Sequence, residues 1–580
     1  MLHNVLPTHV GPYPLLRALI ERLGLFQILH TRLPPHALSR VADADCLVVL
    51  IANLLAGRVA LYNMNDWLST FDATLLLGEG CPTDAFDDAR LATCLDHLDA
   101  YGTDRLLAEV VQHLLLPHPQ TRICHLDTTS LALYGAYDFE DSYFAGENPP
   151  PRPAHGFSKD HRPDLKQLIF GMAIEQHSGL PLAAQLLAGN THDAKAARSL
   201  FQQLTAALPN PETMTIVGDC KLVDGTTLGQ LLGEGFQFIS LFPRNYGLHA
   251  ELLAAARATE LAAWPELARE PGEKKGDPPV VYQGMRFERR LLLEVGPEGT
   301  PIEEPLGFLV IHSPWKAAQQ EQRLNKKKEQ EQERFQEWEK KWAKKEFHCE
   351  ADARAEVQPP KMAVHKVNIE IIPEEREVRR KGAGRPRKGD VREKETVWVV
   401  KGRLEEDQEA IEAERYEGSC FILVFSHIHE PDVWPATRIL SEYRHQSRVE
   451  GHTGFRWLKG PAAVAPVFLH KPERIRALGL VFVLALMVRN YLQFTLIREA
   501  KEREENLEHP FLKRKVERLT TEMALEHFAG VHGILVEEGG IWIRPPVRLR
   551  EAAKVILRCL EVPESVFWTP PVWKSLEEVC

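Results

Sequence analysis

The chain of 580 residues lacks the features of several classes of protein. Its nine cysteines are odd in number, scattered and without Cys-x-x-Cys spacing, which argues against structural zinc and suits a reducing cytoplasm. The amino terminus has no basic segment followed by an apolar one, so we expect no signal peptide. The longest apolar run, 478–488, is shorter than the ~20 residues that cross a bilayer. We therefore expect a buried core helix there and no membrane partner.

A strong positive charge is also missing. The formal net charge is −11, which excludes a uniformly basic nucleic-acid coat, so any DNA contact must come from local basic surfaces. The hydrophobic content of 44% is sufficient for real cores, and the length predicts several domains.

The first part of the chain, residues 1–116, has apolar residues at helical spacing throughout and predicts a small helical domain. Several short helices joined by brief turns are typical both of a helix-turn-helix reader of DNA and of a dimerisation bundle. The sequence shows no recognition helix with clear base-reading residues, and both interpretations stay open.

From about residue 120 the pattern changes to short strands and helices. Asp127 stands where a buried strand is expected to stop, and Asp219 closes a later strand in the same way. Asp193 is expected to be the N-cap of the helix between them. An isolated strand-end aspartate is ordinarily a turn cap. The expected elements are strands at 122–126, 165–176, 180–189, 213–218 and 236–242, and helices at 193–208 and 223–232.

This order of elements is the ribonuclease-H-like one, a mixed α/β sheet that begins with an antiparallel hairpin. In such a sheet the first and fourth strands are neighbours, so Asp127 and Asp219 are expected to lie together. Two adjacent carboxylates repel each other strongly and need a cation between them. Magnesium or manganese prefers such oxygen ligands, and two ions can clamp a phosphodiester.

Residues 246–416 differ in composition from the sequence on either side, and we predict that they form an insertion. The charged segment 316–346 predicts a long helix, with a solvated exposed face as one interpretation and a DNA-tracking arm as the other. The basic segment 378–390 contains Gly384-Arg385-Pro386 and Arg387, which resemble an AT-hook. Arg385 and Arg387 are therefore candidates for minor-groove contact, and a basic disordered loop is the alternative.

After a strand near 420–428, a helix is expected to carry a third acid, Glu450. Tyr443, Gln446 and Glu450 have the spacing i, i+3, i+7 and are expected to share one helix face. Glu450 lies among arginines and lysines, where a lone glutamate is ordinarily a surface ion pair.

Five stretches together resemble bacterial insertion-sequence DDE transposases of the IS-four superfamily, in the IS-sixteen-thirty-four-like branch. They are HLDTTSLALYG, GFSKDHRPDLKQLIFGM, LAGNTHD, VGDCKL and YRHQSRVEGHTGFRWLK. The resemblance implies a ribonuclease-H-like core with a mostly β insertion between the second and third acids. It also implies that Asp127, Asp219 and Glu450 are the catalytic, metal-binding acids, with two Mg²⁺ or Mn²⁺ ions.

The helix signature of this superfamily is met in part. Tyr443 and Glu450 fit, whereas Gln446 occupies the arginine position and Trp457 the lysine position. We therefore expect another cationic side chain nearby to hold the cleaved phosphate. Lys459 is favoured if the helix is distorted around residues 451–454. The candidate DNA-contacting residues of this region are Tyr443, Arg444, Arg448, Arg456 and Lys459.

The resemblance implies cut-and-paste transposition, with cleavage at the element's ends, a hairpin on the transposon end and strand transfer by a freed 3′-hydroxyl. The expected partners are double-stranded inverted repeats and target DNA, bound by a homodimer in the bacterial cytoplasm. Trp398 and Trp315 are candidates to stack on a flipped base, with a core role as the alternative. The competing functions are an inactive DNA-binding regulator derived from a transposase and another ribonuclease-H-like nuclease.

The expected organisation has a helical front, a catalytic core in two parts and a helical carboxyl-terminal region. The boundaries are 1–116 for the front, 117–245 and 417–500 for the core, 246–416 for the insertion and 501–580 for the last region.

Overall fold

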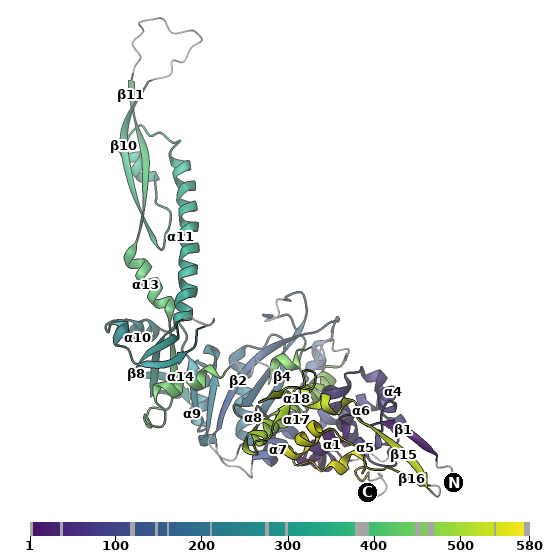
Figure 1. The fold of residues 1–580 in the computed structure, drawn as a ribbon. Helices are drawn as coiled ribbons and strands as arrows, with labels where there is room; N and C mark the ends of the chain where they lie inside the picture. Colours follow the sequence, from purple (N-terminus) through teal and green to yellow (C-terminus); the bar gives the residue numbers. More distant parts are fainter. Residues whose placement is uncertain are drawn as a thin grey trace. The chain divides into compact units, whose positions relative to one another are not determined.

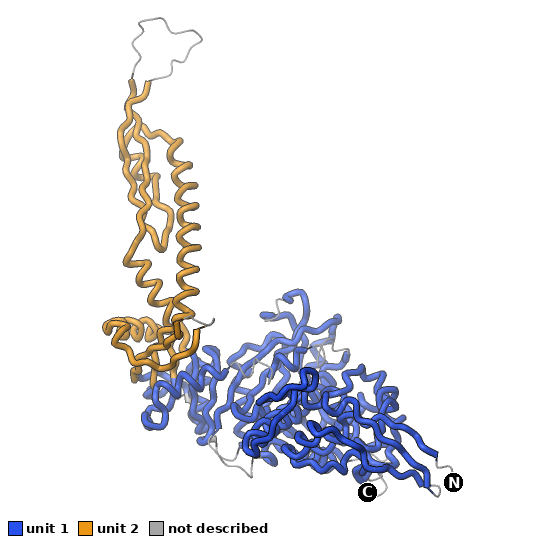
Figure 2. The backbone as a smooth tube through the Cα atoms, in the orientation of Figure 1, with its two compact units in different colours: residues 1–241, 289–306, 425–580 blue, residues 242–288, 307–424 orange. Residues whose placement is uncertain are grey.

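The structure is a computed structural model, and the chain forms two compact units (Figure 2). Unit 1 comprises residues 1–241, 289–306 and 425–580, and unit 2 comprises residues 242–288 and 307–424. The described residues are 4–34, 39–115, 122–145, 149–158, 162–208, 211–272, 278–295, 300–377, 394–446, 454–460, 469–538 and 541–573.

Five strands of unit 1 lie in the order β4-β3-β2-β5-β6. The pairs β2/β3 and β3/β4 are antiparallel, whereas β2/β5 and β5/β6 are parallel, so the sheet is mixed. This arrangement is compatible with the ribonuclease-H-like order expected from the sequence. The strands are β2 (Arg122–Ala132), β3 (Gln167–Glu175), β4 (Pro181–Ala188), β5 (Met214–Gly218) and β6 (Gln237–Leu241).

The helices predicted between these strands are present as α8 (Asp193–Ala207) and α9 (Gly225–Gly233). Each buries an apolar face, with Leu200 and Phe201 of α8 fully enclosed, because their apolar residues recur at helical spacing. The expected N-cap is off by one residue. His192 is the capping residue and accepts a hydrogen bond from the backbone of Ala194, while Asp193 begins the helix itself.

A long helix, α17 (Pro472–Glu502), packs against β4 and contains the apolar run noted in the sequence. It is the one described helix that is long and apolar enough to cross a membrane on length and composition, but 78% of its apolar window is buried inside the protein. The interpretation of this run as a core helix is therefore supported, although the helix extends beyond the run at both ends.

The front of the chain supplies helices that pack around α17 (Figure 1). Bidentate ion pairs join the two parts, with Arg474 bound to Asp96 and Arg476 bound to Asp99. The front helices are α1 (Tyr13–Arg22), α2 (Leu25–Arg32), α3 (Asp43–Ala52), α4 (Met64–Ser69), α5 (Thr74–Leu77), α6 (Asp88–Tyr101) and α7 (Thr103–Leu115).

The prediction of helices alone at the two ends of the chain is wrong. Strand β1 (Val5–His9) pairs antiparallel with β15 (His532–Glu538), which also pairs with β16 (Ile541–Ile543). The two chain ends therefore share one small sheet. The last region also holds α18 (Thr521–Ala529), α19 (Glu551–Cys559) and the short strands β13 (Leu507–Glu508) and β14 (Lys515–Val516).

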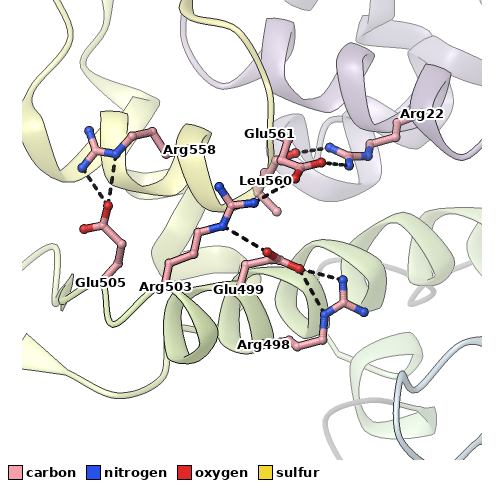
Figure 3. A network of polar contacts seen from close by, with 8 residues as sticks. All are labelled: Arg22, Arg498, Glu499, Arg503, Glu505, Arg558, Leu560 and Glu561. Carbon is pink, nitrogen blue, oxygen red and sulfur yellow. Dashed lines mark hydrogen bonds and ion pairs between the residues drawn. The ribbon is translucent and has the colours of Figure 1, made fainter.

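A network of charged side chains links the end of α1 to the ends of α17 and α19 (Figure 3). Arg22 lies 2.5 Å from Glu561, and Arg503 binds both Glu561 at 2.8 Å and Glu499 at 3.1 Å. Apart from Glu499, these groups are about one third exposed or more, so each pair contributes little alone. Together they connect the first helix to the carboxyl-terminal region.

Unit 2 contains the expected insertion, but it is not mostly β. Its helices include α11, a 29-residue helix that packs along the two-stranded hairpin β10/β11 (Figure 1). The helices are α10 (Gly247–Arg257), α11 (Pro314–Trp342), α12 (Glu350–Glu356) and α13 (Gln408–Ser419). The strands are β7 (Glu266–Glu270), β8 (Val280–Val295), β9 (Thr300–His312), β10 (His365–Glu377), β11 (Lys394–Glu406) and β12 (Cys420–Phe425), and the unit boundary crosses β8, β9 and β12.

The charged helix α11 has one packed face. Phe335, Trp338 and Trp342 are buried against the hairpin, and Glu331 accepts hydrogen bonds from the backbone of Ala363 and Val364. The ion pairs of α11 run to neighbouring elements. The pairs are Lys327–Glu414, Lys328–Glu406 and Glu321–Arg415. The helix is thus fixed by tertiary contacts in addition to its solvated face.

A close approach of α9 to the strand that contains Glu294 gives a stability prediction. A Cβ atom at Gly229 would lie within 3.0 Å of the Glu294 carbonyl oxygen, whereas one at Gly225 would be 3.6 Å from its nearest neighbour. Glycine to alanine in a helix ordinarily stabilises by ~0.5–1 kcal/mol. We instead expect Gly229→Ala to lower the free energy of unfolding by about 1–3 kcal/mol, because the backbone must shift to make room for the added methyl group.

The measurement is the thermal unfolding midpoint, with Gly225→Ala on the same helix as the matched control. A midpoint for Gly229→Ala at or above that of Gly225→Ala would contradict the close packing of α9.

Candidate active site

Asp127 lies in the middle of β2, and the prediction that a strand stops there is wrong. Strand β2 continues to Ala132 because it pairs with β3 along its whole length, with Asp127 opposite Met172. The Asp127 side chain is 9% exposed and its Oδ1 accepts a hydrogen bond of 2.7 Å from the backbone of Thr128. A carboxylate in a central strand is held more rigidly than one in a turn.

Asp219 follows directly after β5, as predicted, and begins a short 3₁₀ turn. Its side chain accepts a hydrogen bond of 2.9 Å from the backbone of Lys221, and its own carbonyl accepts one of 2.7 Å from Ser240. In the parallel register of β2 and β5, His125 pairs with Val217. Asp127 and Asp219 are each two residues further along, so the two strands carry both carboxylates to the same place.

A small cavity lies between these two acids. Its lining includes Asp193 and Lys221, which the sequence did not single out as functional. Asp193, on the first turn of α8, accepts hydrogen bonds from Thr128 Oγ1 at 2.9 Å and from Lys221 Nζ at 3.1 Å. The cavity measures about 10 Å³, enough for one water-sized particle. Its lining residues are Leu126, Asp127, Thr128, Asp193, Ala197, Gly218, Asp219, Lys221 and Leu222.

The charges around the cavity are three carboxylates and one ammonium group. The hydrogen bond to Asp193 raises the pKa of Lys221, so its positive charge is secured there. One cation against three acids leaves an excess of negative charge that favours a further cation. Mg²⁺ and Mn²⁺ prefer oxygen ligands such as carboxylates. The three carboxylates at the cavity are therefore donors of the type that these ions bind.

The third predicted acid, Glu450, lies outside the described residues, as does Arg448. Within the described ranges, no group of three or more His, Cys, Asp or Glu side chains is placed to hold a metal ion. The structure therefore brings together two of the three predicted acids. The sequence predicted only a capping role for Asp193, although this residue ends LAGNTHD, one of the stretches that carry the family resemblance.

The helix expected to continue from Tyr443 toward Glu450 is interrupted at residues 445–446. Helix α14 (Ala436–Arg444) ends before a turn at residues 445–446, so Gln446 does not share a helical face with Tyr443 as predicted. Helix α16 (Phe455–Leu458) follows separately, after Gly454 with φ −140° and ψ −126°. At the end of α14, Tyr443 is half-buried and Arg444 is exposed. Arg456 on α16 is exposed, and Lys459, which directly follows α16, is half-buried.

Hydrogen bonds tie α14 to the strand that carries Asp127. His125 Nε2 lies 2.7 Å from Gln176 Oε1, and Gln176 Nε2 donates a hydrogen bond of 2.7 Å to Glu442 on α14. His125 and Gln176 are buried. Because Glu442 directly precedes Tyr443, this chain of contacts fixes the end of α14 with respect to β2.

A second set of contacts holds the beginning of α14. Thr215 Oγ1 on β5 lies 3.0 Å from Nε2 of His427, whose ring stacks on Trp434 at a centroid distance of 3.7 Å. The Arg438 guanidinium lies 3.9 Å from the Trp434 ring centroid. Burial lowers the pKa of His427 to about 4, so the imidazole is neutral at pH 7.

Helix α16 packs against β3, the strand next to β2. The Phe455 ring lies 6.1 Å from that of Phe170 on β3, and Arg489 of α17 lies 5.6 Å from the Trp457 ring centroid. Trp457, in the expected lysine position, therefore has a packing role. Helix α17 therefore contacts α16 as well as β4.

The predicted DNA contacts of the insertion fall mainly outside the described residues. Arg385 and Arg387 belong to segment 378–393, which joins β10 to β11 and is not described. Trp398 is half-buried beside the aromatic cluster of α11, and its backbone pairs with Phe347, as expected of a core residue. Trp315 is 56% exposed at the start of α11.

Comparison with known proteins concerns the front of the chain. A family model described as a domain of unknown function, DUF4277, matches residues 7–112, and this domain is found at the N terminus of transposase-like proteins. None of the curated proteins matches the chain.

The link between β2 and α14 gives a prediction. Gln176→Leu keeps side-chain size but leaves the buried imidazole of His125 and the partly buried carboxylate of Glu442 without this partner, which costs about 1–3 kcal/mol. We expect faster hydrogen exchange across residues 436–444, measured by mass spectrometry of the intact chain. The control is Gln230→Leu, which removes a hydrogen bond within α9. Equal protection of 436–444 in both variants would show that the link does not hold α14.

Proposed function

We propose that this protein is a DDE transposase that cuts and joins the ends of an insertion sequence. The observation that carries the proposal is the pairing of Asp127 and Asp219 at one cavity by two neighbouring parallel strands. Supporting it are the strand order β4-β3-β2-β5-β6, which fits a ribonuclease-H-like core, and a front domain found in transposase-like proteins. The large insertion between Asp219 and Glu450 fits the same family plan.

In this proposal Asp127, Asp219 and Glu450 hold two divalent cations, Mg²⁺ or Mn²⁺. When bound, these ions supply Lewis acidity that activates the attacking hydroxyl and stabilises the charge of the leaving oxygen. The chain's own residues hold these carboxylates in position. Thr128 and Lys221 hold the Asp193 carboxylate beside the acids, and the backbone of Thr128 and Lys221 orients Asp127 and Asp219.

The reaction consists of four successive displacements at phosphorus. Water attacks the phosphodiester at the element's end, a new P–O bond forms, and the bond to the 3′-oxygen breaks to release a 3′-hydroxyl. That hydroxyl attacks a phosphodiester of the opposite strand, which joins the two strands in a hairpin and releases the 3′-oxygen of the flanking DNA. A second water opens the hairpin and frees the 3′-hydroxyl again. The 3′-hydroxyl then attacks a phosphodiester of the target DNA and releases a 3′-oxygen of the target strand. The proposed phosphate-binding residues are Tyr443, Arg444, Arg448, Arg456 and Lys459, with Arg385 and Arg387 as minor-groove contacts.

The proposed substrates are the terminal inverted repeats and target DNA, and two copies of the chain are expected to hold two ends in one complex. The proposed place of action is the bacterial cytoplasm. An inactive DNA-binding regulator would bind the ends without cutting them, so the assays below separate it from the enzyme.

Substitution of the paired acids tests the proposal. Asp127→Asn and Asp219→Asn remove a charged ligand with little change in shape, so we expect cleavage of a supercoiled donor plasmid in Mg²⁺ to fall at least ~1,000-fold, a loss of ~4 kcal/mol of transition-state stabilisation. Binding to the repeat DNA should persist. The control is Asp224→Asn, because Asp224 caps α9 and asparagine caps equally well. Normal cutting by either cavity variant would refute the assignment.

Metal dependence and the third acid give a further prediction. Chelation with EDTA should stop cleavage, and added Mg²⁺ or Mn²⁺ should restore it in the wild type but not in Glu450→Gln. Gel-shift binding of the repeat DNA should survive in that variant, as its fold is unchanged. If Glu450→Gln cuts at the wild-type rate, another residue supplies the third ligand.

A further inference from the structure

A second, larger cavity lies beside the acid cavity and has no role in the mechanism above. Its volume is about 690 Å³, which falls in the range of ~300–1,000 Å³ usual for small-molecule sites. All of its lining residues belong to unit 1. They come from the start of α7, the segment 149–152, the last part of β4, the start of α8 and Arg476 of α17.

The polar lining is rich in cations. Arg105, Arg152, Lys195 and Arg476 face one acid, Asp104, whose pKa is raised by burial. Each of the three arginines already makes an ion pair. Arg105 binds Glu109 at 3.3 Å, Arg152 binds Asp141 at 2.5 Å, and Arg476 binds Asp99. Lys195 is exposed and makes no ion pair with any described residue. Among the described residues, the cavity therefore offers a positive site with one ammonium group that makes no ion pair.

The remaining lining is apolar and partly flat. Its apolar lining residues include Phe144, Pro149, Pro150 and Pro151, together with Leu187 and Ala188 of β4. The Arg152 guanidinium lies 5.1 Å from the Phe144 ring centroid. Rings of this kind bind the faces of nucleobases and sugars, and stacking is worth ~1–3 kcal/mol per base. A small inorganic anion would use the cations but leave this apolar wall without a partner.

The two cavities flank one turn of helix. Asp193 lines the acid cavity and Lys195 lines the larger one, and residues two apart on a helix point to nearly opposite sides. An α-helix with its side chains is ~10–12 Å across, a distance of the order of one or two nucleotides of a DNA strand. A strand with one phosphate at the acids can thus place a neighbouring nucleotide in the larger cavity.

We propose that this cavity binds one nucleotide of the DNA strand that is being processed. Its phosphate lies against Lys195 and Arg105, and its base or sugar lies against Phe144 and the proline wall. This inference rests on the proposed function for its ligand, and it adds a strand-binding site on the catalytic core that is independent of the insertion.

The test measures binding to the full-length protein in EDTA, where cleavage cannot interfere. The probes are thymidine 5′-monophosphate, inorganic phosphate and a fluorescent 12-nucleotide single strand, followed by calorimetry and fluorescence anisotropy. We expect thymidine monophosphate to bind at least tenfold more tightly than phosphate. Equal affinity, or no binding of either nucleotide probe, would overturn the proposal.

Two variants separate the two halves of the cavity. Lys195→Glu should weaken all three probes at least tenfold, and Ala188→Trp, which fills the apolar side, should weaken the nucleotide probes but not phosphate. Lys501→Glu, an exposed charge reversal at the end of α17, is the control and should change nothing. Wild-type affinity for thymidine monophosphate in Lys195→Glu would overturn the proposal.

These results are distinguishable from failure of the proposed function. If Asp127→Asn cuts normally while Lys195→Glu loses nucleotide binding, the transposase assignment fails and the nucleotide site stands. If Asp127→Asn is inactive while Lys195→Glu binds nucleotides and cuts like the wild type, the assignment stands and the nucleotide site fails.

Discussion

The parallel pairing of β2 with β5 sets the central physical constraint of this protein, because it brings two carboxylates of like charge to one cavity. Asp127 is nearly buried, which strengthens its repulsion with Asp219. The surrounding structure offsets part of that repulsion. Backbone amides of Thr128 and Lys221 bind the two carboxylates, and the ammonium group of Lys221 lies within the same cluster through Asp193. The remaining negative charge suits a divalent cation.

Much of the rest of unit 1 can be understood as support for this strand pair. Helix α17 covers β4, the front helices pack around α17, and the two chain ends meet in the sheet of β1, β15 and β16. Helix α14 is fixed to β2 through Gln176 and to β5 through His427. The segment that leads to Glu450 therefore begins from a well-anchored point. In unit 2, by contrast, α11 and the β10/β11 hairpin form a separate core around Trp338 and Trp342.

Prediction from sequence succeeded where local pattern and strand order were sufficient. The hairpin of β3 and β4, the helices α8 and α9, and the adjacency of Asp127 and Asp219 follow from apolar periodicity, turn residues and known strand order. It failed where partners distant in the chain decide the structure. Strand β1 was read as helix because its partner, β15, lies more than 500 residues away in the chain. Helix α14 ends at Arg444 although the spacing of Tyr443, Gln446 and Glu450 suits a longer helix.

Residue type and spacing along the chain were sufficient to predict the order of the core elements, the two acids at neighbouring strands and the presence of a large charged insertion. Only the tertiary structure decided that Asp193 and Lys221 join the acid cavity and that Asp127 lies within a continuing strand. It also decided that a cationic, partly apolar cavity lies on the other side of the α8 turn. The physical reason is that a cavity depends on the packing of side chains from distant segments, which local propensity does not encode.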